Sequence, residues 1–146
     1  GEQASPRPWL VARMPAFPKY AAPLAEGLAA SHGYPSRSPA EAPINKELAK
    51  IGGKLVSSNG GLACVTCHAA GGSPATQVFE VEGINLAHAG DRLMRPFFER
   101  WMRNPLRIDP SSKMPSFFDE EGKSALTDVL DGDARKQLEA IWNYMR

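Results

Sequence analysis

Residues 64–68 read CVTCH and contain the only two cysteines of a 146-residue chain, with a histidine directly after the second. Two thiols and an imidazole at this spacing are compatible with a disulfide, a redox dithiol, half of a zinc site or the attachment of a haem. Each alternative requires different residues around the motif, so the surrounding sequence can distinguish between them.

The zinc and redox alternatives are poorly supported by the sequence around the motif. A zinc site needs two further ligands at a suitable spacing, and besides carboxylates the chain offers only His32, His68 and His88. A thioredoxin-like dithiol follows a buried strand in a βαβ pattern. The preceding residues 54–63, KLVSSNGGLA, contain no such strand, and no alternation of strands and helices follows.

C-x-x-C-H is instead the motif of c-type haem attachment, in which both thiols form thioethers with the haem vinyl groups. The adjacent histidine gives a ring nitrogen to the iron, so all three residues are used. The sequence therefore predicts one covalent haem c, attached through Cys64 and Cys67, with His68 as an iron ligand. Because a bound haem stabilises only the native state, we expect the haem-free chain to be poorly folded.

A methionine is the natural sixth ligand of an electron-transfer haem, because its soft thioether favours ferrous iron. The candidates are Met14, Met94, Met102, Met114 and Met145. The methionines at 94, 102 and 145 lie in segments with helical spacing and are expected to pack as core or helix-face residues. The one at 114 stands in the irregular stretch DPSSKMPSFF between two prolines, which suits a ligand presented by a loop. His88 is the alternative sixth ligand, although a loop histidine is more often a surface residue.

Three stretches in chain order, GGKLVSSNGGLACVTCHAAGG, WMRNPLRIDPSSKMPSFF and DARKQLEAIWNYMR, resemble class I c-type cytochromes over residues 44–146. The resemblance implies an all-α cytochrome c fold, with three or more helices and long loops around one covalent haem. It also implies Cys64 and Cys67 as anchors, His68 as the proximal ligand and Met114 as the distal ligand. Trp101 is expected to donate its indole N–H to a haem propionate, with core packing as the equal alternative.

The helices can be predicted from periodicity and capping residues. Asn45 is expected to cap a helix with an apolar face at Ile44, Leu48, Ile51 and Leu55. Its Gly52-Gly53 pair predicts a close helix crossing, with Trp142 or Tyr144 against the glycines. A second helix begins after Asp131 or Asp133 and has Leu138, Ile141, Trp142 and Met145 on one face. A third covers about residues 93–104 and ends before Pro105.

Residues 9–33 repeat the later pattern in miniature, since RMPAF at 13–17 matches KMPSF at 113–117 and a helical run follows each. Three interpretations stay open. The segment is the methionine-bearing tail of a preceding cytochrome module, or an N-terminal extension that packs on the domain, or the source of the ligand, Met14 in place of Met114. The Pro- and Ser-rich composition of the stretch before residue 44 indicates a linker. Residues 1–43 and 44–146 are therefore treated as separate regions.

Charge and hydropathy narrow the class of partner. The 17 Lys and Arg residues nearly balance 16 Asp and Glu residues, and no basic run indicates nucleic-acid binding. No apolar stretch approaches the ~20 residues of a membrane-spanning helix. The basic stretch Arg92, Arg95, Arg100, Arg103 and Arg107 is by default a solvated helix face, with haem propionates or an acidic partner as the alternative.

Iron ligated on both faces has no open position for a substrate, so the sequence favours electron transfer over enzymatic activity. The expected partners are a redox donor and acceptor protein, or a fused or associated oxidoreductase. The alternative is a haem enzyme or gas sensor with a labile or absent sixth ligand. Thioether attachment indicates a periplasmic or otherwise exported protein, free or tethered by sequence outside these residues.

Overall fold

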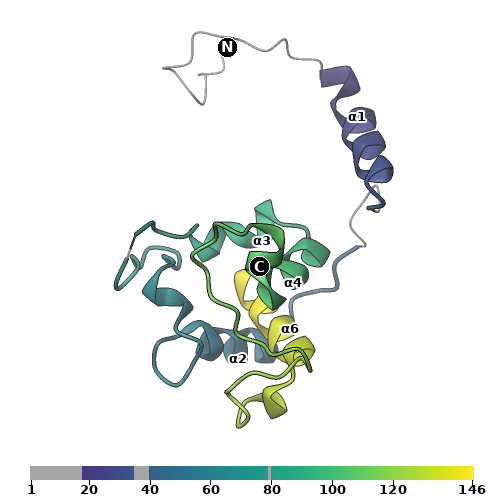
Figure 1. Cartoon of the computed structure of the whole chain (residues 1–146). Helices are drawn as coiled ribbons and strands as arrows, with labels where there is room; N and C mark the ends of the chain where they lie inside the picture. The colour runs from purple at the N-terminus through teal and green to yellow at the C-terminus, as the bar shows by residue number, and fades with distance from the viewer. Residues whose placement is uncertain (1–17, 35–39, 79) are drawn as a thin grey trace. The chain divides into compact units, whose positions relative to one another are not determined.

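The computed structural model describes residues 18–34, 40–78 and 80–146 (Figure 1). The regular structure of these residues is helical and includes no β-strand. The α-helices are α1 (Pro18–Ser31), α2 (Lys46–Val56), α3 (Ala89–Arg92), α4 (Arg95–Arg103), α5 (Pro105–Ile108) and α6 (Ala134–Met145), and the 3₁₀ turns are η1 (Cys64–Thr66), η2 (Leu86–His88) and η3 (Leu130–Gly132). The predicted all-α class is confirmed for the described residues, which also include long irregular segments.

The chain divides into two compact units, and the second begins at Ala40. The described part of the first unit consists mainly of α1, so the helical run predicted after RMPAF is present. No residue of α1 is buried, and its larger apolar side chains, Tyr20, Leu24 and Leu28, are each more than half exposed. Met14 lies outside the described residues.

Both capping predictions for the long helices of the second unit are confirmed. The Asn45 side chain accepts hydrogen bonds from the backbone N–H groups two and three residues later, at 3.0 and 3.1 Å, and so starts α2. At α6 the cap is Asp133, whose carboxylate accepts from the Lys136 N–H at 3.0 Å. Asp131, the other candidate, has a left-handed backbone (φ 60°) and pairs with the Lys136 ammonium at 2.7 Å.

Gly52 lets α2 and α6 cross at close range. A Cβ built at Gly52 would overlap the Ala140 carbonyl oxygen and lie 2.8 Å from the Tyr144 Cβ, while one at Gly53 would lie 3.2 Å from the Tyr144 ring. Tyr144 is thus the residue against the glycines, as one of the two predicted candidates. Figure 1 shows α6, in yellow, packed along α2.

Trp142, the other candidate, packs against α4. Its ring lies 5.1 Å from that of Phe98 on α4, centroid to centroid, and it is 2% exposed. Its indole N–H donates to the Glu41 carboxylate at 3.1 Å, and the same carboxylate pairs with Arg146. These contacts fix the residues just before α2 on the last helix.

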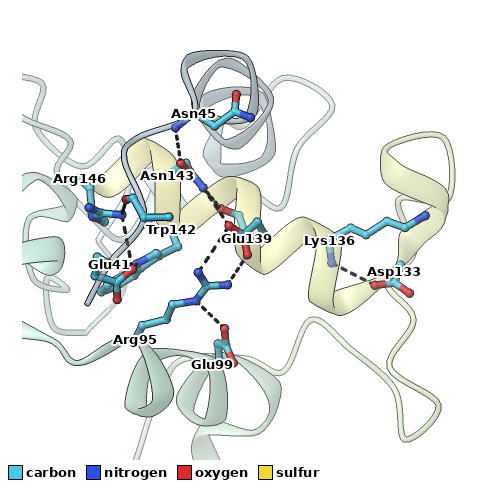
Figure 2. Close-up of polar contacts among 11 residues, drawn as sticks. Glu41, Asn45, Arg95, Glu99, Asp133, Lys136, Glu139, Trp142, Asn143 and Arg146 are labelled. Carbon is cyan, nitrogen blue, oxygen red and sulfur yellow. Dashed lines mark hydrogen bonds and ion pairs between the residues drawn. The ribbon is translucent and has the colours of Figure 1, made fainter. Parts of the chain in front are cut away.

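A chain of polar contacts joins α2, α4 and α6 (Figure 2). Arg95 on α4 pairs with Glu99, one turn later, at 2.9 Å, and with Glu139 on α6. Asn143 donates to the Glu139 carbonyl at 2.9 Å and accepts from the Asn45 backbone N–H at 2.7 Å. The start of α2 is therefore tied to α4 through the side chains of α6.

The predicted third helix starts two residues later than expected, at Arg95. Leu93 is extended (ψ 141°) at the end of α3, and Met94 is extended (ψ 135°) just before α4. Pro96 stands in the first turn of α4, a position where its fixed φ favours helix initiation. The helix ends at Arg103 before Pro105, as predicted, and α5 begins at that proline.

No helix in the described ranges has both the length and the apolar character needed to cross a bilayer.

Candidate functional site

The two cysteines lie on one helical turn. Cys64 opens η1, Cys67 caps it, and the backbone N–H groups of Cys67 and His68 both donate to the Cys64 carbonyl, at 3.2 and 3.0 Å. Side chains three positions apart on such a turn project from the same face. Both thiols are free, so the structure leaves them available as a pair.

The end of α2 holds this turn in place. Leu62 donates its backbone N–H to the Leu55 carbonyl at 2.6 Å, and Ala63 donates to the Ser57 carbonyl at 3.0 Å. Gly61, the residue just before Leu62, lies directly against carbonyl groups of α2. A Cβ at Gly61 would be 2.6 Å from the Leu55 oxygen. The chain can fold back this tightly only because residue 61 has no side chain.

The Cys64 thiol is poorly suited to redox chemistry. Burial raises the pKa of Cys64 to about 11; its own backbone hydrogen bond lowers that pKa, and the neighbouring Cys67 raises it. The thiolate is the nucleophile in disulfide exchange, and reactive cysteines have lowered pKa values. The burial of Cys64 therefore gives no support to the redox-dithiol alternative.

His68 is oriented by a backbone acceptor from a distant part of the sequence. Its Nδ1 lies 2.8 Å from the Ile84 carbonyl oxygen. A ring nitrogen can bond to a carbonyl only as an N–H donor, which assigns a proton to Nδ1; in the neutral imidazole Nε2 then keeps its lone pair. The half-buried imidazole therefore has one nitrogen held and the other suited to a metal.

Residues 83–86 form the wall beside this imidazole. Gly83 donates its N–H to the Cys67 carbonyl at 2.8 Å, and Leu86 donates to the Ala69 carbonyl at 2.8 Å. A Cβ at Gly83 would lie 2.8 Å from the Nε2 of His68 and closer still to two other ring atoms. A glycine at position 83 is thus required for the ring to occupy this place.

Asn85 closes the loop that follows the motif. Its side chain accepts from the Gly71 N–H at 3.0 Å and donates to the Gly71 carbonyl at 2.8 Å. It also accepts from the Ala87 N–H at 3.0 Å and so caps η2. These hydrogen bonds could not be predicted from the sequence, because the partners of Asn85 are main-chain groups, which carry no chemical signature.

Met114 lies in the irregular segment between α5 and η3, as predicted, and is half-buried. Trp101, on α4, donates its indole N–H to the Met114 sulfur with a nitrogen-to-sulfur distance of 3.0 Å. Both residues pack against the same hydrophobic core that includes Cys64. The structure thus brings two of the predicted site residues into direct contact, in a pairing that the sequence analysis did not foresee.

The other methionines and histidines lie elsewhere. Met102 and Met145 are buried in their helices, which confirms that they pack. Met94 is 44% exposed, so its predicted packing is wrong, because the chain is extended there rather than helical. His88 and His32 are exposed.

The basic stretch is partly neutralised within the fold. Arg95 is engaged by Glu99 and Glu139 and so faces α6 rather than a partner. Arg92, Arg103 and Arg107 are exposed, as the solvated-face interpretation expects.

A cavity of about 350 Å³ lies behind the motif, lined by Val56, Asn59, Val65, Pro74 and Tyr144 among others. None of the predicted haem-binding residues lines it. In the described ranges no three His, Cys, Asp or Glu side chains gather as candidate metal ligands, so the zinc alternative gains no support.

No protein-family model matches the chain, and no curated protein matches it significantly.

Proposed function

We propose that the second unit is a class I c-type cytochrome domain that transfers single electrons. In this proposal Cys64 and Cys67 would attach one haem c, His68 and Met114 would ligate its iron, and Trp101 would belong to the haem pocket. The single observation that carries the proposal is the contact between the His68 Nδ1 and the Ile84 carbonyl at 2.8 Å. This contact orients the histidine of the CxxCH motif so that its Nε2 is available as a ligand. Metal-bound histidines typically donate their other ring N–H in this way.

The donor set of this site fits a haem iron. Two free thiols on one turn match two thioether bonds, and an imidazole and a thioether are the ligand pair of electron-transfer cytochromes. The side chains of Leu62, Val65 and Phe117 are apolar and only half-buried against the core. Such surfaces are suited to contact with a large apolar group.

Each of the proposed ligands has a separate role in electron transfer. When bound, the haem supplies a reversible one-electron couple. His68 and Met114 would both ligate the iron and leave no position for a substrate, which disfavours enzymatic turnover. The soft sulfur of Met114 would favour the ferrous state, and the hydrogen bond to the Ile84 carbonyl would orient the imidazole of His68.

The proposed function requires a donor and an acceptor protein, or an oxidoreductase to which the domain is fused or bound. It also places the protein in the periplasm or another exported compartment, because covalent haem is attached there in the bacteria whose cytochromes this chain resembles. Both statements rest on the resemblance and on the CxxCH motif.

Mass spectrometry under denaturing conditions tests the proposal directly. The mature protein should carry the mass of one haem that denaturant does not remove, and it should have no titratable thiol. The oxidised protein should also show the methionine-to-ferric-iron band at the red end of the visible spectrum. A chain without haem that reacts with two equivalents of thiol reagent would refute the proposal. Haem attachment without the band would favour the enzyme or sensor alternative.

A further inference from the structure

Trp101 and Met114 form a contact that neither the CxxCH motif nor the proposed ligand set requires. The indole nitrogen lies 3.0 Å from the sulfur, and sulfur is a weak acceptor that N–H groups seldom approach so closely. The residues are thirteen positions apart and come from different segments, α4 and the irregular stretch after α5. Sequence proximity does not explain the contact.

The tryptophan is the better fixed of the two partners. Its ring stacks on Phe97, one turn earlier on α4, with centroids 6.0 Å apart and planes 23° from parallel. The same helix is anchored to α6 by Arg95 and by the packing of Phe98 on Trp142. The methionine, in contrast, lies in a segment without regular structure, where its own N–H donates to the Ser112 hydroxyl at 3.2 Å.

A thioether can accept this hydrogen bond and still ligate a metal. Its sulfur has two lone pairs, so one can accept from the indole while the other remains for the iron. A hydrogen bond draws electron density from the sulfur and makes it a poorer donor. Ferric iron loses more by this than ferrous iron does, so the bond raises the reduction potential, in keeping with the known effect of outer-sphere hydrogen bonds.

We propose that Trp101 is a positioning residue for Met114: its indole N–H holds the thioether at the sixth position and raises the potential of the haem. This inference rests on the proposed function. It also differs from the role expected from the sequence, a hydrogen bond to a haem propionate. An indole has one N–H donor, so full engagement by the methionine leaves none for the propionate.

Trp101→Phe in the haem-loaded protein tests the inference, because phenylalanine keeps an aromatic ring beside Phe97 and removes only the donor. Cyanide binding to the ferric protein requires the methionine to dissociate. We expect cyanide binding to accelerate about threefold to tenfold, the range that corresponds to one hydrogen bond, because the loss of the bond that holds the thioether outweighs the stronger donation of the freed sulfur. We expect the reduction potential to fall by up to about 59 mV, the equivalent of a tenfold change for one electron. This decrease should be the same at every pH between 5 and 9.

Phe97→Leu is the matched control, since it disturbs the stacking but retains the indole N–H. Its cyanide rate should rise by less than that of Trp101→Phe, because the donor that holds the sulfur is retained. An unchanged cyanide rate in Trp101→Phe, with a potential shift that varies with pH, would assign the indole to a propionate and overturn the inference. If the wild type lacks the methionine-to-iron band, the proposed ligation itself fails, which is a distinct result.

Hydrogen exchange supplies a second measurement that does not depend on the stability of Trp101→Phe. Met114→Leu keeps a side chain of similar volume and removes the acceptor. The Trp101 indole proton should then exchange with water at least fivefold faster than in the wild type in the same oxidation state. Equal exchange rates would contradict the inference.

Discussion

The crossing of α2 and α6 differs in burial from the segments that carry the predicted ligands. At the crossing, Leu55, Leu138 and Ala140 are at most 1% exposed, and Gly52 lies directly against the backbone of α6 at Ala140. Around the ligands, Val65, Trp101 and Met114 are only half-buried, and Ile84 is 46% exposed. The first region is complete as a protein core, and the second leaves apolar surface uncovered by the described chain.

This difference separates what the polypeptide stabilises by itself from what we propose the haem adds. Burial of apolar surface is the main favourable contribution to folding, roughly 25 cal/mol for each Å². At the helix crossing, the protein's own side chains already provide this stabilisation. Changes at the crossing should therefore alter the stability of the fold, whereas changes at the ligand segments should mainly alter the chemistry of the site.

The largest effect is expected for Gly52→Val. The new side chain would meet the Ala140 carbonyl and the Tyr144 Cβ, and the backbone of α6 cannot move aside as a flexible side chain can. We expect a loss of about 3 kcal/mol or more in the free energy of unfolding, at or beyond the usual range for overpacking. Denaturant titration followed by circular dichroism measures it.

Gly72→Ala is the control for this variant, because a Cβ there would have no atom within 4 Å. Its unfolding midpoint should be close to that of the wild type. Equal stability of the Gly52 variant and the wild type would mean that the crossing is looser than the structure indicates.

Met114→Ala should act on the second region and leave the crossing intact. Haem should stay attached through Cys64 and Cys67 and ligated by His68. The iron should bind carbon monoxide at least tenfold faster than in the wild type, and the potential should fall, because the soft ligand that favours ferrous iron is lost. Stopped-flow absorbance and a redox titration provide the two readouts.

Met14→Ala distinguishes the two methionines that share the R/K-M-P-x-F pattern. It should change neither the carbon monoxide rate nor the potential if residues 9–33 belong to a preceding module or to an extension. If it opens the iron instead, the ligand is Met14 and the assignment of Met114 is wrong. A wild type that already binds carbon monoxide rapidly would favour the sensor or enzyme alternative.

Asn45→Ala removes the side-chain cap of α2 while the contact of its backbone N–H with Asn143 can persist. The expected cost is about 1 kcal/mol, as for other N-cap replacements. Asn45→Asp keeps an acceptor and should come close to wild-type stability. A thermal melt of the three proteins compares them, and an alanine variant as stable as the wild type would show that the cap contributes nothing.

The smallest effect is expected for Asp133→Asn, which keeps the cap of α6 and removes its charge. The hydrogen bond from the Lys136 backbone lowers the pKa of Asp133. A carboxyl whose folded pKa is depressed stabilises the fold above its unfolded pKa of about 3.9, and that stability is lost as pH falls through the folded pKa. The wild type should therefore lose slightly more stability than the variant below pH 4, in melts at a series of pH values. Parallel pH profiles would contradict this.

The parts of the fold that could be predicted from the sequence depend on local rules. The caps at Asn45 and Asp133 and the apolar face of α6 follow from residues a few positions apart. The close crossing at Gly52 was also predictable, because two adjacent glycines inside a helix need a packing reason. The choice between Trp142 and Tyr144 was not, since it depends on how α6 is rotated against α2.

The residues of the candidate site were chosen from the sequence by side-chain type and spacing, and the haem that they would bind stays a prediction, whereas contacts made by the backbone were not predictable. Cys64, Cys67, His68 and Met114 stand out by type and spacing. The acceptor that orients His68 is a main-chain carbonyl at Ile84, which any residue could supply. The pairing of Trp101 with Met114 depends on where α5 directs the chain, and no local rule determines that direction.

The contacts that close the fold also carry a consequence for the order in which it assembles. Asn45 and Asn143 are 98 positions apart, and Glu41 and Trp142 are 101 apart. Long-range pairings of this kind form late, because a large loop must close first. During synthesis the CVTCH segment emerges well before α6 exists, when α2 still lacks its packing partner. The Cys64 thiol, which the folded domain buries, is thus accessible on the nascent chain, and the covalent attachment that we propose can precede completion of the core.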